Sequence, residues 1–196
     1  MSIDGRQASQ VTDNAPGPGS VYNLIKAALA DPGNAKERHP GYRLQRLVTL
    51  RLEMDEVEIG KLADLAGIEV KPPMVNADAL FDENLRAVIA WAGLWPLFEE
   101  SGPGLHHHAI RPTGYLYQLD KVDALGMEAW RAYYRCMAPA RQMLAASIIW
   151  LYRGRKDNTW LRRVPCTWHA AEGIAEMRRA GLLQDWAKLV VRYPGW

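Results

Sequence analysis

Three consecutive histidines, His106, His107 and His108, are the residues of this sequence with the most conspicuous chemistry. Imidazole binds transition metals and exchanges protons near neutral pH. Side chains of successive strand residues point to opposite faces, so a strand here would direct His106 and His108 to the same side. A metal site would then need a further ligand, which Glu99 or Glu100 could supply across a predicted hairpin. The alternative is a polar strand without chemistry.

Basic residues form a second set and are concentrated in the last third of the chain. Residues 131–196 contain 12 Lys and Arg against 4 Asp and Glu, a net charge of +8. Residues 1–130 contain 12 against 18, a net charge of −6, so the formal net charge of +2 hides two opposite halves. A basic surface attracts phosphate. We therefore expect the C-terminal third to contact nucleic acid, and the acidic remainder to contact a protein partner or a second copy of the chain.

Motifs of common enzyme classes are absent from the sequence, which has no GxSxG, HExxH or GxxxxGKS/T. Cys136 and Cys166 are too far apart for a zinc knuckle or a CxxC pair. Cys166 and His169 could act as nucleophile and base, but a buried structural cysteine is the commoner case. We predict a protein that acts without catalysis, without a cofactor and without a metal.

Helices are predicted where apolar residues recur every three or four positions. The clearest covers residues 76–92, where Gly93 can end it. Two extended runs flank the Ser-Gly-Pro-Gly turn at 101–104, which predicts a hairpin, and residues 32–41 are expected to form a polar loop. The other helices predicted in this part cover residues 21–31, 42–54 and 56–66.

The last third of the sequence predicts the same order again, three helical elements and then a hairpin. Leu189, Val191 and Tyr193 alternate like one face of a strand, so residues 182–196 are predicted to form that hairpin. Thr167 can cap the helix before it. A helix over residues 120–137 is predicted to precede the three helical elements, which are predicted over residues 139–151, 159–165 and 167–181.

The segments ARQMLAASIIWLYR, NTWLRRVP, TWHAAEGIAEMRRAGLL and LLQDWAKLVVRY resemble the helices and wing of winged helix-turn-helix domains. The resemblance covers about the last sixty residues, and a looser version covers residues 42–112. It implies that the third helix enters a DNA major groove with its N-terminal side chains on the bases, while the wing contacts the backbone. Trp168 is bulky for such a position, and winged helices also bind proteins. The implied interface contains Arg162, Arg163, Thr167, Trp168, His169, Glu172, Arg179, Lys188 and Arg192.

Residues 106–122, HHHAIRPTGYLYQLDKV, resemble the His-rich motif of the HD-type relaxases of conjugative elements. The resemblance implies a metal-dependent phosphodiesterase centred on His106 and His108. This chain has Gln118 where that family has a further histidine, and it contains no His-Asp dipeptide. The hydrolase is therefore kept as a second alternative.

The sequence as a whole predicts a mainly α protein with short β-hairpins, built as two tandem winged-helix-like units. A flexible tail over 1–20 precedes an acidic unit over 21–118 and a basic unit over 119–196. Without a long apolar run and with only two cysteines, we expect a cytoplasmic protein without a membrane partner. The predicted function is a regulator of transcription or accessory factor that docks on duplex DNA. The first alternative is a protein-interaction subunit of a larger complex.

Overall fold

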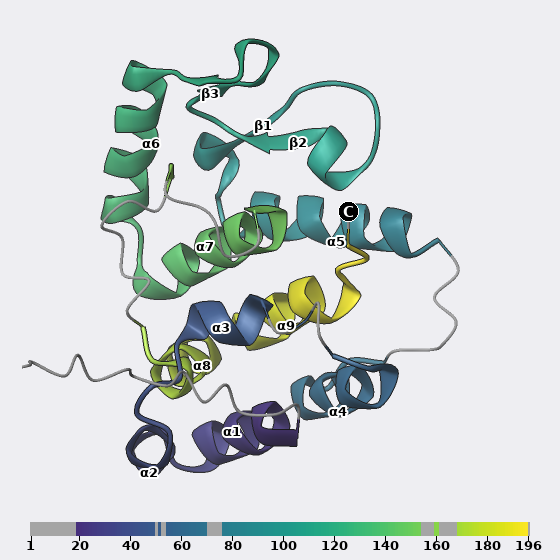
Figure 1. Ribbon diagram of the computed structural model, residues 1–196, viewed down its shortest axis with the longest axis vertical. Coiled ribbons are helices and arrows are strands. Elements are labelled where there is room, and N and C mark those ends of the chain that lie inside the picture. The colour runs from purple at the N-terminus through teal and green to yellow at the C-terminus, as the bar shows by residue number, and fades with distance from the viewer. Residues whose placement is uncertain are drawn as a thin grey trace, which may run out of the picture.

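The computed structural model describes residues 19–49, 51, 54–69, 76–153, 159–160 and 168–195. These residues form a mainly helical structure, as predicted, with two small antiparallel hairpins, of which the sequence predicted the first (Figure 1). Nearly all of the predicted tail lies outside the described residues. The helix expected from Val21 begins at Gly19.

The helices before the first hairpin are those expected from the periodicity, with one addition. The loop predicted over 32–41 is wrong, because residues 32–38 form a helix. Its N-terminus is stabilised by the Asp31 carboxylate, which accepts the Asn34 N–H at 3.2 Å, and by Pro32, whose fixed φ suits the first turn. The five helices are α1 (Gly19–Ala30), α2 (Pro32–Arg38), α3 (Leu44–Thr49), α4 (Glu56–Ala66) and α5 (Ala77–Trp91).

The predicted hairpin after α5 is confirmed. Strand β1 (Phe98–Glu100) follows the 3₁₀ turn η2 (Trp95–Leu97) and pairs antiparallel with β2 (Ile110–Pro112). The histidines do not form a strand, which corrects the expectation for His106 and His108. They form the 3₁₀ turn η3 (His106–His108), in which His106 has a φ of 34°.

A second, smaller hairpin was not predicted. Its strands are only two residues long, too short for a period-two pattern to register. Close packing supports it: a Cβ on Gly114 would lie 2.9 Å from the Met127 backbone. The hairpin comprises β3 (Tyr115–Leu116), the 3₁₀ turn η4 (Tyr117–Leu119) and β4 (Lys121–Val122).

Four helices follow, and the last of them replaces the predicted C-terminal wing. Residues 183–192 are helical because the buried residues Leu182, Trp186, Leu189, Val190 and Tyr193 recur at helical spacing. Of this set, only Leu189 and Tyr193 also fit the alternation that predicted a strand. Most of the predicted element over 159–165 lies outside the described residues. The four helices are α6 (Ala124–Cys136), α7 (Pro139–Arg153), α8 (Ala170–Arg179) and α9 (Leu183–Arg192).

Helices from both ends of the chain share one core. Helix α8 packs on α1 and α2, while α9 packs on α4 and α5. Figure 1 shows α3, α8 and α9 in the middle of the molecule, with α6 and the hairpins at one end. The buried side chains of residues 21–118 and 119–196 therefore form a single cluster. Within the described ranges, no helix combines the length and apolarity that crossing a membrane requires.

Candidate functional site

Three residues of the predicted nucleic-acid interface, Arg162, Arg163 and Thr167, lie outside the described residues. Trp168 is half-buried and packs against the core. The helix expected to be capped by Thr167 is capped by His169 instead. The predicted groove-reading end of α8 can therefore be judged from Trp168, His169 and Glu172.

His169 has a structural role in this fold. Its side chain is 2% exposed, and its Nδ1 accepts the Ala171 N–H at 3.1 Å. Its Nε2 lies 2.5 Å from the carbonyl oxygen of His39, so this nitrogen carries the proton and donates it. Both ring nitrogens are engaged inside the protein, which corrects the expectation that His169 reads bases.

The N-terminal turn of α8 is covered by the chain around residues 36–44. The Leu44 N–H donates to the Trp168 carbonyl at 3.0 Å, and the Ala170 N–H donates to the Tyr42 carbonyl at 2.8 Å. Glu172 forms an ion pair with Lys36 at 2.6 Å, which lowers the pKa of the Glu172 carboxyl. A DNA groove would have to displace these contacts, so the first turn of α8 is not presented for recognition.

The remaining predicted cations lie on two helices rather than on a recognition helix and a wing. Arg179 is exposed on α8 and pairs with Glu176 at 2.5 Å. Lys188 lies on α9, 3.8 Å from Asp185. Arg192 is the last residue of α9 and is half-buried.

Among the described residues of the C-terminal third, the positive charge without a carboxylate partner lies mostly outside the predicted interface. Each carboxylate described in residues 131–195, on Glu172, Glu176 and Asp185, pairs with a Lys or Arg. Net charge predicted an excess of cations, but it could not tell which of them would lack a carboxylate. Among the described residues, the arginines without a carboxylate partner are Arg131, Arg135, Arg141, Arg178 and Arg192.

The histidine string forms a polar cluster with two carboxylates of α5. The His106 N–H donates to Asp82 Oδ1 at 2.5 Å, and His106 Nε2 lies 3.2 Å from Asp78 Oδ1. His106 Nδ1 lies 2.6 Å from His107 Nδ1. When His106 Nε2 carries the proton and donates it to Asp78, His106 Nδ1 is unprotonated and accepts a hydrogen bond from His107 Nδ1–H. His106, Phe81 and Tyr193 also form edge-to-face ring contacts.

Charges around this cluster are paired on α5. Arg86 bonds Asp82 at 2.7 Å and also pairs with Glu100, so a carboxylate that the sequence offered as a further metal ligand bonds a guanidinium. The Asp82 hydrogen bond raises the pKa of Arg86. Sequence reasoning missed Asp78, Asp82 and Arg86, although their spacing of four residues places them on one face of a helix.

Burial lowers the pKa of His107 to about 4, and the neighbouring His106 and His108 add to the effect. His107 is therefore neutral at pH 7. No group of three or more His, Cys, Asp or Glu in the described ranges is arranged to hold a metal. The hydrogen bonds of His106 to Asp78 and Asp82 hold the 101–109 loop against α5.

Comparisons with protein families, with curated proteins and with solved structures find no match for this chain. The resemblances to winged helices and to HD-type relaxases therefore stay predictions.

Proposed function

We propose that this protein is a non-enzymatic regulator or accessory factor that binds nucleic acid through its C-terminal third. The observation that carries the proposal is the charge pairing in residues 131–195. All three described carboxylates there are neutralised, whereas five arginines have no carboxylate partner. Such an excess of positive charge attracts phosphate and releases counterions from it.

The size of the effect follows from the number of arginines that solvent can reach. Arg135, Arg141 and Arg178 are exposed, and Arg131 and Arg192 are half-buried. Three to five phosphate contacts give a slope of log K against log salt of about −3 to −4.5. Affinity should therefore fall about 60- to 500-fold between about 50 mM and about 200 mM salt.

The winged-helix part of the proposal fits the first unit better than the second. Helices α3, α4 and α5 followed by the β1–β2 hairpin keep the order of a winged helix over residues 42–112. The third helix of that unit carries the exposed carboxylates Asp78 and Glu83, which repel phosphate. We propose that this acidic unit contacts a protein and that the C-terminal cations contact the nucleic acid.

The test measures binding of a labelled DNA duplex at both salt concentrations. Arg135→Ala/Arg141→Ala/Arg178→Ala and Arg162→Ala/Arg163→Ala are compared with wild type. The matched control is Lys26→Ala/Lys61→Ala, which removes two exposed cations from the acidic part. We expect weaker binding by the arginine variants only. Absence of binding at low salt, or equal losses in the control, would overturn the proposal.

A protein-interaction subunit is the second candidate, favoured by one observation. Four large aliphatic residues within ten positions of the second hairpin and α6 are more than two-fifths exposed: Leu116, Leu119, Val122 and Leu125. Exposed aliphatic groups at this density mark protein contact sites. If Leu119→Ser/Leu125→Ser abolishes a concentration-dependent association seen in sedimentation while duplex binding is absent, this candidate replaces the first.

A further inference from the structure

Two exposed aromatic residues and an arginine lie near the turn that ends α5. Trp91, the last residue of α5, is 63% exposed, and Tyr133 on α6 is 41% exposed. The Tyr133 hydroxyl donates to the Gly93 carbonyl at 3.3 Å. Arg141 Nη1 lies 3.9 Å from the position that a Cβ on Gly93 would occupy. We call Trp91, Tyr133 and Arg141 the Gly93 patch.

The rings of this patch stand in a background of small residues. Ala87 precedes Trp91 by one helical turn and Ala129 precedes Tyr133 by one turn, and both alanines are exposed. Among the described residues, the other large exposed apolar side chain on α5 or α6 is Leu125, which lies two helical turns before Tyr133 near the start of α6. The patch therefore offers separate planar faces rather than a broad aliphatic surface.

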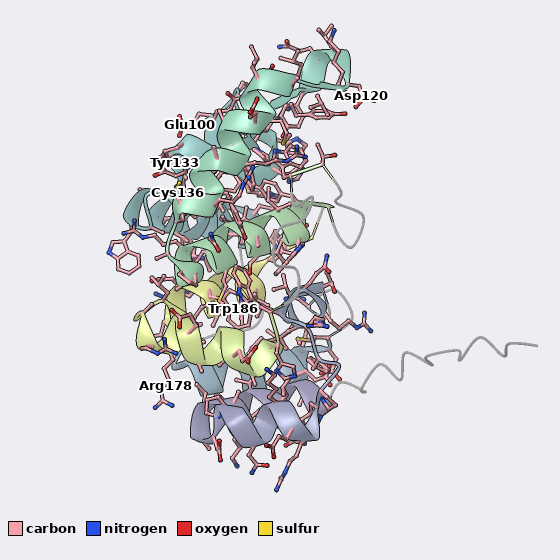
Figure 2. All side chains as sticks on the ribbon, turned by 90° about the vertical axis from the view of Figure 1, so that its left-hand side faces the viewer. Glu100, Asp120, Tyr133, Cys136, Arg178 and Trp186 are labelled. Atoms are coloured by element: carbon pink, nitrogen blue, oxygen red, sulfur yellow. The ribbon has the colours of Figure 1, made fainter. Side chains whose placement is uncertain are left out.

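Positive charge without a carboxylate partner accompanies the rings. Arg141 and Arg135 form no ion pair among the described residues. Figure 2 shows Tyr133 on α6 and Arg178 on α8 on the side of the molecule that faces the viewer. At Gly93, Arg141 adds a cation to the aromatic residues, and this is the combination on which unpaired bases and their phosphates bind.

We propose that the Gly93 patch binds single-stranded nucleic acid, with a base stacked on Trp91 and a phosphate contacted by Arg141. This inference rests on the proposed function and names the strand type and the surface. In a duplex the faces of the bases are stacked on one another inside the helix. A duplex can therefore contact the arginines through its phosphates, but its bases cannot stack on the ring of Trp91. A protein partner would need a wider complementary face than two rings among alanines.

The test uses the full chain with a fluorescein-labelled oligothymidylate of about 12 nucleotides and a duplex of the same length. We expect Trp91→Ala to weaken single-strand binding about 5- to 100-fold and to change duplex binding by less than about twofold. Trp91→Phe, which keeps a smaller ring, should retain most of the single-strand affinity. Arg141→Ala should reduce the single-strand salt slope by about 0.7.

Val57→Ala is the matched control, because Val57 is 64% exposed on α4, away from the patch. Trp91 is exposed, so thermal unfolding of Trp91→Ala should match wild type. Equal single-strand binding by wild type and Trp91→Ala overturns the inference. Duplex binding without single-strand binding overturns it and leaves the proposed function standing, whereas binding of neither overturns both. Loss of self-association in Trp91→Ala with unchanged single-strand binding makes the patch a protein interface and also overturns it.

Discussion

Replacing Ser147 with alanine should lower the free energy of unfolding by about 1–3 kcal/mol. Ser147 Oγ accepts the Trp186 Nε1–H at 3.0 Å where α7 meets α9, and both side chains are fully buried. The substitution removes a neutral hydrogen bond and leaves the indole N–H in a site that excludes water. The better helix propensity of alanine returns about 0.5 kcal/mol, which keeps the expected loss inside this range.

Urea unfolding of wild type, Ser147→Ala, Trp186→Phe and the double variant measures this loss. In the Trp186→Phe background the indole N–H is gone, so Ser147→Ala should cost less than about 0.5 kcal/mol. Trp150→Phe is the control for replacing a buried indole ring. The Trp150 N–H is buried and has no hydrogen-bond partner among the described residues, so this variant removes an indole N–H without removing a hydrogen bond. Ser147→Ala would refute the reasoning if it cost the same free energy of unfolding in wild type and in Trp186→Phe, or if it cost nothing in wild type.

The remaining predictions concern pH and backbone fit. His107 is held at a pKa of about 4, below its ordinary value of 6.5, so the unfolded chain binds more protons between these values. The stabilisation by neutral His107 is complete above about pH 6.5 and is lost as the pH falls towards 4. Urea midpoints measured from pH 7 to 4.5 should therefore fall more steeply in wild type than in His107→Gln. Gly114→Ala should cost about 3 kcal/mol or more, because φ is +85° and its Cβ would meet the Met127 backbone at 2.9 Å. Gly60→Ala, where a Cβ meets nothing within 4 Å, should stabilise α4 by about 0.5–1 kcal/mol, as thermal unfolding can check.

Long helices with a clear stop signal could be predicted from the sequence. Helix α5 ends where Gly93 adopts a φ of +65°, and α4 ends where Gly67 adopts +66°, as the glycine positions indicate. For helix α9 the strand prediction is wrong because Leu189, Val191 and Tyr193 alternate like one face of a strand, whereas the first two are buried in a helix and Tyr193 is its buried C-cap. The burial of Trp186 and Val190, at helical spacing from Leu189 and Tyr193, distinguishes the helix from a strand.

The burial of His169 and the pairing of the charged residues depend on tertiary contacts, which local sequence patterns do not reveal. His169 is buried because segments 130 residues apart meet, as its bond to His39 shows. The sequence placed an excess of positive charge in the last third. Whether each arginine is neutralised depends on which carboxylates the fold brings near it, as the pairing of Lys36 with Glu172 illustrates.

The proposed nucleic-acid contact is tested most directly by the slope of log K against log salt for a labelled duplex. The account predicts a slope of about −3 to −4.5 for the wild type. For Arg135→Ala/Arg141→Ala/Arg178→Ala it predicts a slope weaker by about 3, because each arginine that no longer binds a phosphate lowers the slope by about one. Wild type that does not bind at about 50 mM salt, or a triple variant with the wild-type slope, would contradict it.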